Sequence, residues 1–211
     1  KSGTDYVTGW NIPTPTAISG WTFIGYRANN TASSTIGIAS SHVGESYKIN
    51  SGLAVAYRSI YERTLTLKYA ANGGSGTVPS DQTDTQYYNS GAPSGTSNSG
   101  ANITTVTFTL ATTNITKTGY TFNNWGTINF SPDVDNTTTT KTVYALWKVN
   151  SYTVTYNYSE NGGSSATKTS ATVNYGDSID LTPTATKSGW TFVGWNTNKD
   201  ATTKLSSLTM G

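Results

Sequence analysis

Few residues of this sequence carry the side chains that catalysis requires. The 211 residues include one histidine, His42, eleven Asp and Glu residues, and no cysteine. Nucleophilic and acid–base catalysis need His, Cys or paired carboxylates held close together, and no such group recurs at a fixed spacing along the chain. We therefore predict that the protein is not an enzyme, has no catalytic residues and uses no cofactor.

Two carboxylates, Asp133 and Asp135, have a spacing that could begin a calcium-binding loop. Their segment, SPDVDNT, lacks the glycine and the distal glutamate of an EF-hand. His42 lies in the segment ASSHVGES, where we expect a solvated loop histidine rather than a ligand. The sequence therefore predicts no metal site.

The charge of the chain disfavours two classes of partner. Charged residues make up 11% of the sequence and the formal net charge is +2, which is too little for a nucleic-acid groove or a basic membrane-binding face. No stretch approaches the roughly 18 to 20 apolar residues of a membrane span. We expect no nucleic-acid partner and no membrane insertion.

The composition favours β-structure. Thr, Tyr, Val and Trp are well represented and methionine occurs once, which is typical of half-buried strands rather than helices. Because the chain has no cysteine for disulfides, packing alone must hold small units together. We predict a mainly β chain.

A glycine-aromatic motif occurs three times, as SGWTFIGYRA from Ser19, TGYTFNNWGT from Thr118 and SGWTFVGWNT from Ser188. Recurrence at wide spacing is typical of a repeat array in which each copy builds the same small core. Rings that recur in register on strands are most simply core residues, and each contributes roughly 1.5 to 3 kcal/mol on burial. The predicted structural core is Trp21, Phe23, Tyr26, Tyr120, Phe122, Trp125, Trp147, Trp190, Phe192 and Trp195.

Two further elements recur around this motif. An alternating strand followed by Asn-Gly-Gly appears as RTLTLKYAANGGSG and as SYTVTYNYSENGGSS, and Asn-Gly favours the positive φ angles of a tight turn. A closing strand, TKTVYALWK at 140–148, has a weaker counterpart at 52–62. The predicted modules are 1–61, which lacks an opening strand, a complete module at 62–150, and 151–211, which lacks a closing strand.

The middle module contains a loop insert at about 75–102. From Asn72 to Gly119 the chain is longer than between the corresponding Asn161 and Gly189. The extra segment is rich in Gly, Ser, Thr and Asn and contains two prolines, a composition that marks loops. We expect the insert to be the most mobile part of this module.

Together these motifs resemble the internalin B-type repeat, also called the Listeria-Bacteroides repeat. The third module matches through Asn161-Gly162-Gly163, Tyr175-Gly176, Pro183 and the run from Gly189 to Trp195, and the middle module supplies the ending Tyr144-Ala145-Leu146-Trp147. The sequence departs from the pattern at Asn124, where the repeat has glycine, and at Tyr26, where it has tryptophan.

The resemblance implies tandem, small β-grasp-like modules in an elongated array. Such modules occur in secreted or wall-attached bacterial surface proteins and in phage-borne proteins, where they act as spacers and sometimes bind a partner, and the family has no catalytic residues. We therefore expect a non-enzymatic, extracellular stalk or spacer of a modular surface adhesin or fibre. Its partners would be neighbouring modules of the same or another copy of the chain.

Two alternatives remain open. The chain could be a recognition module for a host glycan or protein, with the insert and with Trp10, Tyr87 and Tyr88 as a possible ligand surface. It could also be a head-to-tail structural subunit of a filament or phage appendage. The incomplete first and last modules would each expose an unpaired β edge, and strand addition from another copy is one way to cover such an edge.

Overall fold

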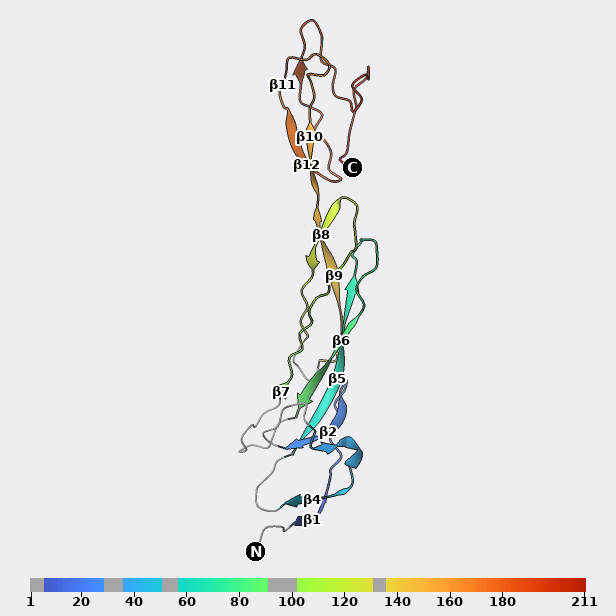
Figure 1. The fold of residues 1–211 in the computed structure, drawn as a ribbon, viewed down its shortest axis with the longest axis vertical. Helices are drawn as coiled ribbons and strands as arrows, with labels where there is room; N and C mark the ends of the chain where they lie inside the picture. The colour runs from blue at the N-terminus through green and yellow to red at the C-terminus, as the bar shows by residue number, and fades with distance from the viewer. Residues whose placement is uncertain (1–5, 29–35, 51–56, 91–101, 131–135) are drawn as a thin grey trace. The chain divides into compact units, whose positions relative to one another are not determined.

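The computed structural model describes residues 6–28, 36–50, 57–90, 102–130 and 136–211, with the backbone alone for 6–10, 28, 46–50 and 102. Its described part is mainly β, as predicted, and contains one short 3-10 helix, η1 (Ser40–His42). Figure 1 shows the strands of the described residues. The chain divides into two compact units. The amino-terminal unit comprises 1–70, 79–112 and 127–143, and the carboxy-terminal unit comprises 71–78, 113–126 and 144–211. The three-module organisation remains a prediction.

The amino-terminal unit is built on an antiparallel sheet with the strand order β3-β2-β5-β6-β7. A separate two-stranded sheet pairs β1 with β4. The strands are β1 (Tyr6–Asn11), β2 (Thr22–Ala28), β3 (Ile38–Ala39), β4 (Ser46–Asn50), β5 (Tyr57–Ala70), β6 (Gln82–Asn89) and β7 (Asn102–Ile103).

Strand β5 is 14 residues long and belongs to two of the predicted modules at once. Its first half pairs with β2, where Phe23 lies opposite Tyr61, and it pairs with β6 from Ile60 onward. The predicted alternation is present, because Leu65, Leu67 and Tyr69 are all buried. A single continuous strand therefore spans the predicted boundary between the first and second modules.

The prediction that the whole insert is a loop is wrong for residues 82–89, which form β6. This strand pairs with β5 over eight consecutive positions. The side chains that it buries are amides, since Gln86 is 1% exposed and its Oε1 accepts a hydrogen bond of 2.8 Å from Nε of buried Arg63. Gln86 Nε2 donates to the carbonyl of Thr104 at 3.0 Å. In β6, hydrogen-bonded amides thus occupy the buried positions where an alternation of apolar residues usually identifies a strand. Residues 91–101 of the insert lie outside the described residues.

The carboxy-terminal unit holds the other two versions of the repeated motif. Strand β8 (Tyr120–Trp125) pairs with β9 (Thr140–Val149), so that Phe122 lies opposite Trp147. Residues 140–143 of β9 belong to the amino-terminal unit, and β9 also pairs with β5. In the third module β10 (Ser151–Thr155) pairs with β12 (Ser170–Asn174), and β11 (Ser165–Ala166) pairs with β13 (Ala185–Thr186).

The Asn-Gly-Gly turn after β5 has the predicted geometry. Asn72 and Gly73 both have positive φ, at 49° and 81°, and the N–H of Gly74 donates to the carbonyl of Ala71 at 3.0 Å. Two successive positive φ angles define the hairpin turn that matches the right-handed twist of the strands, and they are the reason for Asn-Gly at this point.

One residue, Asn150, joins β9 to β10. Its N–H donates to the carbonyl of Gly119 at 2.9 Å, and its carbonyl accepts from the N–H of Tyr175 at 2.8 Å. A Cβ on Gly119 would lie 2.0 Å from the ring of Tyr175, so a glycine is required where the second module meets the third. The junction is therefore packed and hydrogen-bonded.

Strand β6 provides a test of its structural role. We expect Gln86→Ala to lower the free energy of unfolding by about 1 to 3 kcal/mol, because it removes the acceptor of the hydrogen bond from Nε of buried Arg63. Thr83→Ala, on an exposed position of the same strand, should change it by about 0.5 kcal/mol or less. Urea denaturation of both variants measures the difference, and equal effects would show that β6 is dispensable.

Candidate functional site

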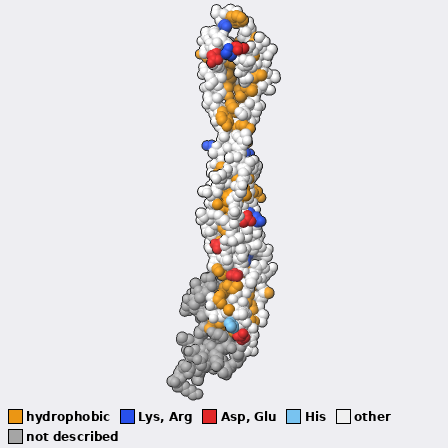
Figure 2. Space-filling view, turned by 45° about the vertical axis from the view of Figure 1, so that its right-hand side comes forward, with side chains coloured by type: hydrophobic (Ala, Val, Ile, Leu, Met, Phe, Trp, Pro, Cys, Tyr) orange, Lys and Arg blue, Asp and Glu red, His pale blue; other side chains and the backbone are white. Residues whose placement is uncertain are grey.

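Residues 189–195 of the third module, which we call the open segment, carry three exposed large hydrophobic side chains. Trp190 is 72% exposed, Val193 65% and Phe192 36%. Figure 2 shows a strip of hydrophobic side chains on the part of the molecule that contains β10–β13. A contiguous exposed apolar strip of this kind often marks an interaction site.

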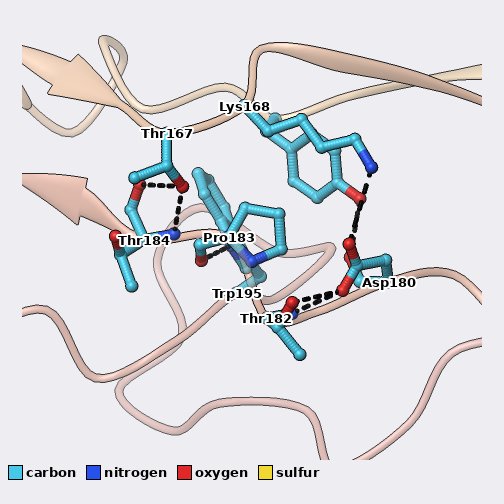
Figure 3. Close-up of polar contacts among 8 residues, drawn as sticks. Thr167, Lys168, Asp180, Thr182, Pro183, Thr184 and Trp195 are labelled. Carbon is cyan, nitrogen blue, oxygen red and sulfur yellow. Dashed lines mark hydrogen bonds and ion pairs between the residues drawn. The ribbon is translucent and has the colours of Figure 1, made fainter.

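The far end of the open segment is anchored in the core of the third module. The ring of Trp195 lies 5.3 Å from the ring of Tyr156, which is 4% exposed, and its Nε1 donates to the carbonyl of Pro183 at 2.7 Å (Figure 3). The Tyr156 hydroxyl in turn donates to the carbonyl of Asp180 at 2.6 Å. These bonds hold the last residue of the open segment in the core of the third module.

A small polar cluster supports the same region (Figure 3). Oδ1 of Asp180 accepts hydrogen bonds from the hydroxyl of Thr182 at 2.6 Å and from its N–H at 2.9 Å, and Lys168 Nζ lies 3.5 Å from Oδ2. These contacts, chiefly the Thr182 hydroxyl and then its N–H, lower the pKa of Asp180. The Asp180 carboxylate is solvent-exposed and accepts its hydrogen bonds from Thr182, two residues further along the same loop. We therefore interpret the cluster as one that stabilises this turn.

The structure divides the ten predicted core aromatics into three groups. Trp21, Tyr26 and Trp125 are buried. A second group is half-buried and packed in ring pairs: Phe23, Tyr120, Phe122, Trp147 and Trp195. The prediction of burial is wrong for the other two, Trp190 and Phe192.

The missing neighbour of these two rings is a paired strand. In the first module β5 pairs with β2, and in the second β9 pairs with β8. Among the described residues no strand pairs with the open segment. Trp190 therefore faces solvent, and Phe192 stays partly exposed although its ring lies 5.2 Å from that of Trp195. The repeated motif identifies the equivalent positions in the three copies. Whether the rings at those positions are buried depends on a neighbouring strand, which β5 and β9 provide for the first two copies.

The predicted ligand surface of Trp10, Tyr87 and Tyr88 is only partly described. Tyr88 stacks on Tyr61 with ring centroids 5.8 Å apart and lies 5.7 Å from the ring of Trp21, so it takes part in the aromatic packing of the amino-terminal unit. Tyr87 is half-buried opposite Glu62 on β6. Trp10 is in β1 opposite Tyr47, and its side chain lies outside the described residues. The joint site remains a prediction.

The histidine and the two aspartates that the sequence offered for catalysis or metal binding are His42, Asp133 and Asp135. Nδ1 of His42 lies 2.9 Å from Oε2 of Glu45, and both side chains are more than half exposed. Asp133 and Asp135 lie outside the described residues. In the part of the chain that the structure describes, no helix has the length and apolar character needed to cross a membrane.

A comparison with protein-family models matches residues 152–210 to the Listeria-Bacteroides repeat domain. The match confirms the resemblance drawn from the motifs of the third module and indicates a bacterial surface repeat module. Comparisons with curated proteins and with solved structures gave no match. The open segment lies within the matched residues, so the exposed rings belong to the repeat motif itself.

The two ends of the open segment should respond differently to truncation. We expect Trp195→Ala to cost about 3 kcal/mol of unfolding free energy, at the low end for a tryptophan truncation because the ring is half-buried. Trp190→Ala should change stability by about 0.5 kcal/mol or less, because the ring faces solvent. Urea denaturation followed by far-UV circular dichroism compares them, and an equally large loss at Trp190 would contradict the exposure seen here.

Proposed function

We propose that this chain is a non-enzymatic, extracellular stalk or spacer of a modular bacterial surface protein. The observation that carries the proposal is the continuity of strands across the predicted module boundaries. Strand β5 spans the boundary predicted between the first two modules, and β9 continues through the single residue Asn150 into β10. Neither of these two connections contains a flexible linker.

The physical consequence is that the backbone connecting two modules is hydrogen-bonded on both sides of the connection. Tension applied along the chain would pass directly from one paired strand to the next. The Asn150 junction adds two backbone hydrogen bonds and the close contact of Gly119 with Tyr175. These features suit a spacer that keeps two parts of a surface protein at a fixed separation, because repeat arrays owe their stiffness to such nearest-neighbour contacts.

The match of the third module to a surface repeat domain supports the proposed location. A stalk also needs few chemically reactive side chains, which agrees with the scarcity of His and Cys. Partners in this proposal are the modules on either side, and no substrate or cofactor takes part.

Tandem fusions test the spacer function. One, two and three copies of the chain, each placed between the same two reporter domains, should increase the maximum dimension by an equal increment per copy in small-angle X-ray scattering. Inserting Gly-Ser-Gly-Ser next to Asn150 should shorten the increment, since a flexible joint replaces a paired strand.

The matched control is the same insertion after Thr202, an exposed position away from the junction, which should leave the increment unchanged. Copies that add mass without adding length would contradict a spacer.

A further inference from the structure

The arginines of this chain are unusual in their burial. The sequence contains three, Arg27 in β2 and Arg58 and Arg63 in β5, and all of them are buried in the amino-terminal unit. A buried guanidinium is costly unless hydrogen-bond acceptors or an opposite charge surround it. Each of these side chains therefore needs a compensating group.

Arg63 has its compensation within the chain. Its Nε donates to Oε1 of Gln86 at 2.8 Å, and its Nη1 donates to the carbonyl of Asn136. Its guanidinium carbon lies 4.2 Å from the centre of the Trp21 ring. Acceptors and an aromatic face together stabilise a buried guanidinium, so Arg63 is a structural part of the fold.

Arg27 and Arg58 lie on the other face of the same sheet. They are directly opposite each other in β2 and β5, so their side chains project from one face. In the adjacent strand β6, Asn89 is opposite Ile60, two positions from Arg58, and therefore belongs to this face as well. We call Arg27, Arg58 and Asn89 the arginine cluster.

The arginine cluster contains buried polar atoms that the described residues leave unsatisfied. Arg58 is 2% exposed, and its Nε and Nη2 have no hydrogen-bond partner within the described part of the chain. Asn89 is 0% exposed, and the same holds for its Nδ2 and Oδ1. Buried polar groups without partners are rare and costly, and charged ones are the most costly. These atoms therefore point to a group from outside the chain.

The charges of the cluster indicate what that group is. Like charges directly opposite each other in a sheet are destabilising, and no ion pair among the described residues includes Arg58. Burial lowers the pKa of Arg27, and the charge of Arg58 lowers it further. A dianion neutralises both guanidiniums, whereas a monoanion leaves one of them uncompensated.

We infer that the arginine cluster is a binding site for one divalent oxyanion of the sulfate or phosphate type. Nε and Nη2 of Arg58 lie on the same side of the planar guanidinium, so together they can donate to two oxygens of one anion. Asn89 donates from Nδ2, and Arg27 supplies the second positive charge. Because these side chains are almost completely enclosed, the anionic group is taken up as the chain folds.

The inference goes beyond the proposed stalk function and does not depend on it. The cluster draws one residue from each of three neighbouring strands, β2, β5 and β6. An anion bound there stabilises the amino-terminal unit whatever the unit does, since it binds the folded chain and not the unfolded one.

Amide hydrogen exchange of the full chain, measured by mass spectrometry with sodium sulfate or phosphate at constant ionic strength, tests the inference. Slow amides in β2, β5 and β6 should exchange about tenfold more slowly when the anion is present at about ten times its dissociation constant. Acetate, a monoanion, should have a much smaller effect. Amides in β10 and β12, which belong to the carboxy-terminal unit, are the internal control for general effects of the salt.

Three variants complete the test. Arg58→Gln removes the paired donors and should abolish the protection by sulfate and phosphate. Arg58→Lys keeps the charge but not the planar pair of donors, and should weaken binding by about tenfold or more. The matched control is Lys68→Gln, which makes the same change of charge at an exposed position of β5 and should leave the protection unchanged.

The source of the anion is distinguished with glucose 6-phosphate. Protection by this compound would show a site that accepts a phosphate ester of a larger ligand, and protection by the inorganic anions alone would show a site for the free ion. Three results would each overturn the inference: no protection by sulfate or phosphate, equal protection by acetate, or equal protection of Arg58→Gln and the natural sequence.

Discussion

Pairing of a closing strand onto the glycine-aromatic strand is the interaction on which the first two copies of the motif depend. It buries one face of the aromatic motif and aligns its rings in edge-to-face contacts, as Phe122 shows with Trp147. It also fixes the indole of Trp147, whose Nε1 lies within hydrogen-bonding distance of the carbonyls of Ala71 and Asn72. Because Asn72 Nδ2 donates to the carbonyl of Ala145, the Asn-Gly-Gly turn and the closing strand stabilise each other. The turn, the strand and the aromatic core therefore form one cooperative element.

The same pairing explains the connection between modules. Strand β5 pairs with β2 in its first half and with β6 from Ile60 onward, so one strand carries the hydrogen bonds of both predicted modules. Loss of one module's core then weakens an edge of its neighbour, which is the nearest-neighbour coupling expected of repeat arrays. Stability and mechanical continuity thus have a common origin in the backbone hydrogen bonds of shared strands.

Much of the fold could be predicted from the sequence because its signals are local. The alternation of Leu65, Leu67 and Tyr69 and the Asn-Gly turn that follows depend only on neighbouring residues. Strand β6 was missed because its buried side chains include amides such as Gln86, which look like loop residues until their partner Arg63 is known. The exposure of Trp190 could not be predicted from the motif, since it depends on whether a distant strand pairs with that edge. The open segment as a site was therefore visible only by comparing three copies of one motif in three surroundings.

Amide hydrogen exchange of the full chain, resolved by residue, tests most directly whether the closing strand is the element that orders each module. Amides that face the closing strand in β2 and β8 should exchange slowly, at rates governed by the opening of their modules. The equivalent amides at 191–195 should exchange orders of magnitude faster, while that of Leu205, bonded to Trp195, remains protected. Equal protection at all three motifs would contradict the central claim, because the third would then be ordered without a closing strand.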